Sequence, residues 1–174
     1  MQIALTFFHS CQGPMVYYSI PKEISKYKVS VLSRLMDIST DLGFFEHHSE
    51  ENEIISIANQ CFAIQHDAAR GCQELLMLSY ISDKNQKITD FKDILKKYAK
   101  KMMDTPKLYK AFYLDSPKVA DGKGNNGGVD PEVTEKYGVL QNILSDFYKD
   151  CEKHDKMLQD GSVKIFGKQF DFHW

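Results

Sequence analysis

The amino-terminal segment predicts a β-hairpin, and this feature limits the fold more than any other in the chain. Two apolar, aromatic runs, at residues 2–8 and 15–20, are joined by a polar segment that ends in Gly13 and Pro14. Glycine supplies the backbone freedom that a tight turn needs, and proline fixes φ beside it. Pro21 ends the second run because proline has no N–H to donate to a strand ladder. We therefore expect the chain to begin with two antiparallel strands.

The spacing of apolar residues divides the rest of the chain into a helix, three strands and two helices. Helical spacing indicates one helix at about 22–40, a second after Thr89 or Asp90, and a third at 131–157. Between the first two helices, the segments "FFEHHSE", "NEIISIANQCFAIQHDA" and "CQELLMLSYISD" have the composition of strands. The sequence predicts an α+β fold with a five-stranded antiparallel sheet and the element order β-β-α-β-β-β-α-α.

The length of 174 residues favours one domain. We predict a single domain over residues 1–160, with a flexible glycine-rich loop at 115–130 and an aromatic tail at 161–174. The tail "SVKIFGKQFDFHW" is either a final strand or a segment that docks on a neighbour. The amino terminus has the pattern of a strand and not of a secretion signal, and no apolar run is long enough to span a bilayer. We expect a soluble, cytoplasmic protein.

Two patterns are similar to cofactor-binding or metal-binding motifs, and each has a simpler interpretation. Gly122, Gly124 and Gly127 match the spacing G-x-G-x-x-G, but no strand directly precedes them and no helix directly follows, so we predict a loop and no nucleotide cofactor. His47 and His48 are neighbours on a predicted strand, where they point to opposite faces and cannot share a metal ion.

The cysteines allow a second class of function. Cys11 lies near His9, and Cys61 lies near His66, so either thiol could pair with an imidazole base in a small cysteine-dependent hydrolase. Neither thiol is predicted to lie beside a helix amino terminus or other oxyanion-stabilising donors. Buried or turn cysteines are the preferred interpretation, and the hydrolase stays as an alternative.

Charge is distributed unevenly along the chain. Residues 35–69 contain seven acidic side chains and no lysine or arginine, whereas residues 87–110 contain eight lysines and three acids. Lys92, Lys96 and Lys100 recur every four residues and form one stripe on the second helix. The stripe is either a solvated helix face or a surface that attracts an acidic partner or an anionic membrane. The net charge of -2 argues against a dedicated nucleic-acid binder.

A set of exposed aromatic and basic positions gives the candidate partner-binding residues. Arg70 lies in the predicted turn "HDAARG", where it either fills the turn, forms interface hydrogen bonds or acts as an arginine finger on a GTPase. The complete predicted set is Phe44, Phe45, Arg70, Lys92, Lys96 and Lys100.

The hairpin "FFHSCQGPMVYYSIP", followed by an amphipathic helix, resembles the start of longin domains. It is most similar to those of nitrogen-permease-regulator-like and DENN-related proteins. The subsequent order of one helix, three strands and two helices is also the longin order, and roadblock and profilin folds share it in part. The resemblance covers residues 1 to about 113 and, loosely, 131–157, while the glycine-rich loop and the aromatic tail depart from a minimal longin domain.

This resemblance implies a non-enzymatic scaffold in which Gly13 and Pro14 are structural and no catalytic, cofactor-binding or metal-binding residue exists. Longin-like domains dock small Ras-like GTPases or other longin or roadblock proteins, as homo- or heterodimers, or take part in vesicle-trafficking complexes. We expect such an adaptor here, with peripheral membrane contact through the lysine-rich helix as a further possibility. The alternative binding class is a profilin-like actin-binding protein.

Overall fold

The structure is a computed structural model, and it describes residues 1–9, 12–39, 41–66, 71–113 and 130–159, with the backbone alone of 162–165 and 168–171. Its centre is a five-stranded antiparallel sheet with the strand order β2-β1-β5-β4-β3. The strands are β1 (Gln2–His9), β2 (Gly13–Ile20), β3 (Gly43–Ser49), β4 (Ile55–Gln65) and β5 (Gln73–Ser82). The predicted α+β class and the antiparallel sheet are confirmed.

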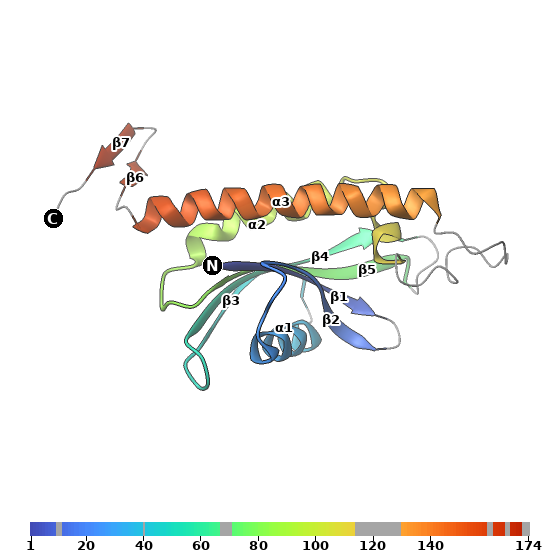
Figure 1. Ribbon diagram of the computed structural model, residues 1–174, viewed down its shortest axis with the longest axis horizontal. Helices are drawn as coiled ribbons and strands as arrows, with labels where there is room; N and C mark the ends of the chain where they lie inside the picture. The colour runs from blue at the N-terminus through green and yellow to red at the C-terminus, as the bar shows by residue number, and fades with distance from the viewer. Residues whose placement is uncertain are drawn as a thin grey trace.

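Helices cover both faces of the sheet. Figure 1 shows α1 (Lys26–Ile38) on one face and α2 (Lys92–Met103) together with α3 (Pro131–Gln159) on the other. Two short 3-10 helices, η1 (Thr89–Phe91) and η2 (Leu108–Tyr113), flank α2. A separate hairpin of β6 (Ser162–Ile165) and β7 (Lys168–Asp171) follows α3.

The predicted element order differs from the observed one in detail. Neither 3-10 helix was expected, and the tail forms two strands that pair with each other instead of one final strand. The first helix is shorter than the predicted 22–40, because Ser25 caps it by accepting a hydrogen bond from the Lys28 backbone N–H. Most of the predicted glycine-rich loop, including Gly122, Gly124 and Gly127, lies outside the described residues.

The β1–β2 hairpin forms as predicted and contains one irregularity. Gly13 has a φ of +78°, a left-handed conformation that favours glycine. Leu5 pairs with Tyr18 and Thr6 pairs with Val16, so Tyr17 is an extra residue in β2 and forms a β-bulge. Tyr17 and Tyr18 consequently both pack on the α2 and α3 side of the sheet.

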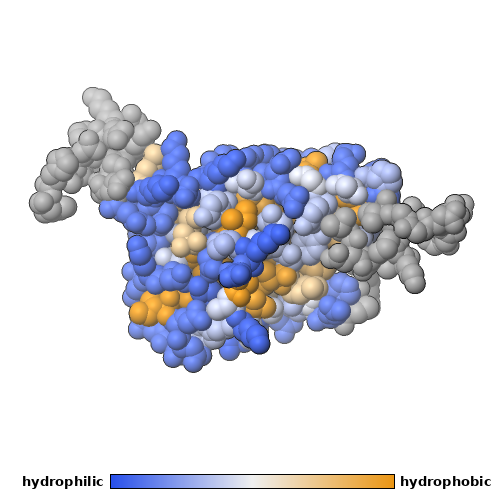
Figure 2. All heavy atoms as spheres, in the orientation of Figure 1, coloured by the Kyte–Doolittle hydropathy of each residue, from blue (hydrophilic) through white to orange (hydrophobic). Residues whose placement is uncertain are grey.

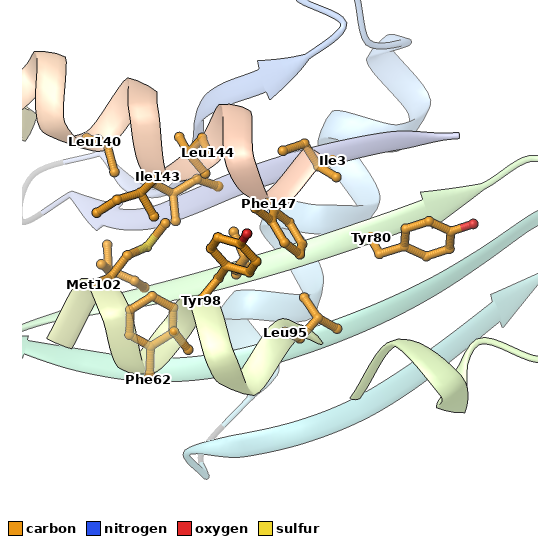
Figure 3. Close-up of a cluster of buried hydrophobic side chains, with 14 of the residues drawn as sticks. Ile3, Phe62, Tyr80, Leu95, Tyr98, Met102, Leu140, Ile143, Leu144 and Phe147 are labelled. Carbon is orange, nitrogen blue, oxygen red and sulfur yellow. The ribbon is translucent and has the colours of Figure 1, made fainter. Parts of the chain in front are cut away.

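The larger core lies between the sheet and the helices α2 and α3. Figure 3 shows Tyr98 and Phe147, from α2 and α3, meeting above the sheet, with ring centroids 5.3 Å apart. Phe7 of β1 stacks on Phe112 of η2 at 5.2 Å. These contacts hold both helices and η2 against the sheet and leave little of this face exposed.

The smaller core lies beneath α1. Four apolar side chains of this helix are buried against the opposite sheet face: Val31, Leu32, Leu35 and Met36. Lys28, only 6% exposed, anchors the amino-terminal end of α1 through hydrogen bonds to Gln2 and Asp83. Among the helices that the structure describes, none is long and apolar enough to cross a membrane.

Candidate partner-binding surface

Helix α2 has two polar sides with different surroundings. On the side towards α3, Lys97 forms a salt bridge with Asp150 at 2.7 Å and Lys101 forms one with Asp146 at 3.4 Å. The apolar face between the two polar sides is buried, and it consists of Leu95, Tyr98, Ala99 and Met102. The remaining side therefore faces away from α3, and it carries the three lysines of the predicted stripe.

This side of α2 lies beside the edge strand β3. The Lys92 ammonium stands 5.4 Å from the ring centroid of Phe44, which places a cation over an aromatic face. Lys96 and Lys100 follow at four-residue intervals and are exposed. Met103 continues the same stripe and is 46% exposed. We call these five residues the α2–β3 surface: Phe44, Lys92, Lys96, Lys100 and Met103.

The lysines of the α2–β3 surface carry unbalanced positive charge. No carboxylate among the residues described by the structure forms a salt bridge with Lys92, Lys96 or Lys100. Lys97 and Lys101, on the same helix, are both neutralised by acids of α3. The helix therefore directs three uncompensated charges away from the body of the protein.

The structure divides the set of six residues predicted from the sequence. Phe44 and the three lysines lie together. Phe45 does not join them, because adjacent strand residues point to opposite faces, and it packs with the residues beneath α1. Arg70 lies outside the described residues.

Sequence reasoning missed two residues of this region. Met103 is exposed on the lysine stripe, and its spacing from Lys96 and Lys100 was the available signal. Gln60 lies directly opposite Phe44 in the strand register and is 8% exposed. Its Oε1 atom accepts no hydrogen bond from the part of the chain that is described. No sequence pattern marks Gln60, because its environment depends on how α2 crosses the sheet.

The two histidines of β3 lie on different sides of the sheet, as their positions on a strand predict. The His48 Nδ1 atom is 3.0 Å from the Ser56 hydroxyl, and its Nε2 atom is 3.7 Å from Glu46. His47 faces the α1 side, where burial, followed by the nearby Arg34 charge, lowers its pKa below 6.5. Within the described ranges, no group of three His, Cys, Asp or Glu side chains is arranged to hold a metal ion.

The two predicted cysteine–histidine pairs have different outcomes. Cys11 lies outside the described residues. Cys61 is 2% exposed, and burial raises the pKa of its thiol to about 11, so the thiol stays protonated at neutral pH. His66 bonds instead to Glu74 at 2.7 Å and stacks on Tyr109. Cys61 is therefore a poor candidate for a nucleophile.

A hollow of about 310 Å³ lies between α2 and α3. Its lining includes Lys97 and Asp150, which neutralise each other, and Tyr98 also donates a hydrogen bond to Asp150 at 2.8 Å. These bonds join the two helices. The hollow therefore offers less unbalanced charge than the α2–β3 surface.

The chain was also compared with known proteins. No protein-family model matches it, and no curated protein sequence matches it.

Proposed function

We propose that this protein is a non-enzymatic, longin-like adaptor whose α2–β3 surface binds an acidic face of a partner protein, and that the partner is a small Ras-like GTPase. The observation that carries the proposal is a row of three exposed lysines beside a partly exposed Phe44, and none of the three forms a salt bridge with an acid of the described residues. Charge of one sign attracts a partner of opposite sign, and an aromatic side chain within it supplies contact area.

The spacing of the lysines supports recognition of an extended acidic surface. Positions four apart on a helix are separated by about 6 Å along the axis, so Lys92 and Lys100 span about 12 Å. Three separated ammonium groups match several carboxylates better than one small anion. The lysines are exposed and hydrated in the free protein. They therefore act mainly through long-range attraction, which increases the association rate.

The choice of a Ras-like GTPase depends on the longin resemblance. The arrangement of an antiparallel sheet with one helix on one face and two on the other is compatible with it. An anionic membrane is the competing ligand for the same lysines, because both ligands offer negative charge. The two are separated by the experiment below.

The test measures binding of the purified protein to a panel of Ras-like GTPases, each loaded with GDP or with a non-hydrolysable GTP analogue, by biolayer interferometry. We expect one GTPase to bind, and the triple variant K92E/K96E/K100E to bind it at least about tenfold more weakly. The matched control is K26E/K84E/K149E, which reverses three exposed lysines elsewhere and is expected to bind as the wild type does.

Two results would overturn the proposal. One is failure of every GTPase to bind at protein concentrations of tens of micromolar. The other is equal weakening by the two triple variants, which would indicate a net-charge effect without a site. A parallel sedimentation assay uses phosphatidylserine vesicles. If the vesicles bind the wild type but not K92E/K96E/K100E, and no GTPase binds, the surface is a membrane-binding surface.

A further inference from the structure

The outer edge of β2 is an unusual surface for a sheet edge. Its sequence, Gly-Pro-Met-Val-Tyr-Tyr-Ser-Ile, contains no charged residue, although charges and especially lysines commonly protect edge strands. All eight residues are partly exposed. In the strands that the structure describes, β1 is the neighbour of β2 on one side, and no strand lies on the other.

A groove of about 360 Å³ follows this edge. Its floor is the segment Val16–Ser19, and its two walls come from the helix layers on either side of the sheet. Tyr137 of α3 forms the wall on one side, and Ile24 and Val29, before and within α1, form the other. In Figure 2, hydrophobic residues are visible between the α3 layer and the α1 layer.

The floor of the groove places side chains towards both walls. Val16 packs with the residues beneath α1, while Tyr18 packs with the core beneath α2 and α3. An extended strand has the same property, since its successive side chains point to opposite faces. A strand laid along β2 would therefore place alternate side chains against Tyr137 on one side and against Ile24 and Val29 on the other.

The charge of the groove identifies the chemistry of its occupant. Lys22 is the charged residue in the lining, and it lies just past the end of β2. The Ser19 hydroxyl donates a hydrogen bond of 3.1 Å to the Lys22 carbonyl, which holds the chain turn at this end of the groove. Lys22 makes no salt bridge to any acid in the described segments. A carboxylate of the occupant would balance this charge.

We propose that the β2 edge binds an extended segment of a partner protein as a sixth strand, and that this segment carries alternating apolar side chains and an acidic residue opposite Lys22. Backbone hydrogen bonds would supply affinity, while the two walls and Lys22 would supply specificity. A second copy of β2 fits less well, because β2 has no acidic residue to place near Lys22. This site is separate from the α2–β3 surface and does not depend on the GTPase proposal.

The probe for this site is the amidated peptide Glu-Val-Thr-Val-Thr-Val-Glu, which offers an acid at either end and so fits in either strand direction. Titration into the ¹⁵N-labelled protein, to millimolar peptide, is followed by two-dimensional NMR. We expect shifts centred on the amides of Val16, Tyr18, Ser19 and Lys22. The same peptide with the nitrogens of its valines, threonines and second glutamate methylated keeps its side chains but loses its backbone amide N–H donors, and it is expected to cause no such shifts.

A charge exchange tests the role of Lys22. K22E is expected to bind the glutamate peptide at least about tenfold more weakly than the wild type does. A peptide with lysine in place of both glutamates is expected to bind K22E more tightly than it binds the wild type. Lys22 is exposed, so this change should leave folding intact, and K26E serves as the matched control. Absence of β2 shifts, equal binding by the methylated peptide, or equal binding by K22E and K26E would each overturn the proposal. Shifts in β2 that grow with protein concentration in the absence of peptide would assign the edge to a second copy and also overturn it.

Discussion

Strand β2, at one edge of the sheet, holds no charged residue, whereas β3, at the other edge, holds Glu46 and two histidines and lies beside the lysines of α2. Both strands are partly exposed, and each has one strand neighbour in the described sheet. Charged side chains keep β3 hydrated and discourage addition of a strand, and β2 lacks them. The comparison shows that the two edges of one sheet differ in charge, so β2 is the edge that is less protected against the addition of a strand.

The largest expected difference between the edges is in their supporting cores. Phe7 is 7% exposed and packs on Phe112 and Tyr17 behind β2, so Phe7→Ala should lower the free energy of unfolding by about 3–5 kcal/mol. Phe44 of β3 is partly exposed, and Phe44→Ala should cost about 1 kcal/mol. Urea unfolding followed by circular dichroism measures both. Equal losses would contradict the view that β2 is held by a packed core and β3 mainly by its surface.

A smaller effect is expected from the hydrogen bond that joins β2 to η2. The Tyr17 hydroxyl donates to the Ala111 carbonyl at 2.5 Å, and Ala111 is buried. Tyr17→Phe should lower the free energy of unfolding by about 1–3 kcal/mol because the buried carbonyl loses its donor. Tyr18→Phe is the matched control and should stay within about 0.5 kcal/mol of the wild type. A similar loss in both variants, measured by urea unfolding, would show that the bond to Ala111 is unimportant.

Acid should weaken the β3 edge through His47. Burial first, and then the charges of Arg34 and His48, hold the folded-state pKa of His47 below 6.5, while Glu51 opposes this shift. As the pH falls, His47 therefore takes up a proton in the unfolded chain before it does so in the folded chain. The stability contributed by neutral His47 is present above pH 6.5 and is lost as the pH falls through the depressed folded pKa. In urea unfolding at pH 7.5 and 5, His47→Gln should become more stable relative to the wild type at the lower pH. A constant difference would refute the assignment.

The smallest expected effect is from the cation over Phe44. Lys92→Gln removes the charge 5.4 Å from that ring and should lower the free energy of unfolding by about 0.5–1 kcal/mol. Lys96 lies on the same exposed side of the helix and contacts no aromatic ring of the described segments, so Lys96→Gln should change stability less. Differential scanning calorimetry of the two variants measures this. A larger loss in Lys96→Gln would show that the Lys92 charge over Phe44 does not stabilise the fold.

The hairpin and the helices could be predicted because they depend on local signals. Gly13 and Pro21 mark the ends of β2, and helical spacing located α2 and α3 to within a few residues. The bulge at Tyr17 could not be predicted, because it is defined by the register with β1 and not by the sequence of β2 alone. The β6–β7 hairpin was also not predicted. The aromatic residues of the tail indicate strand structure, but they do not show which strand each one pairs with.

The candidate surface was predictable only in part. The lysine stripe follows from four-residue spacing, and the structure confirms its exposure. Phe44 and Phe45 were proposed together, although alternation along a strand separates them. The sequence could not show which of the two meets the lysines, because that depends on the face of the sheet over which α2 packs.

The bulge at Tyr17 has a consequence for the growth of the sheet. An extra residue bends an edge and increases its twist, so a long, straight strand cannot stay in register along the whole length of β2. The uncharged edge would otherwise be a template for stacking one molecule on the next. The bend shortens the segment over which a further strand can pair with β2, and this disfavours the stacking of one molecule on the next.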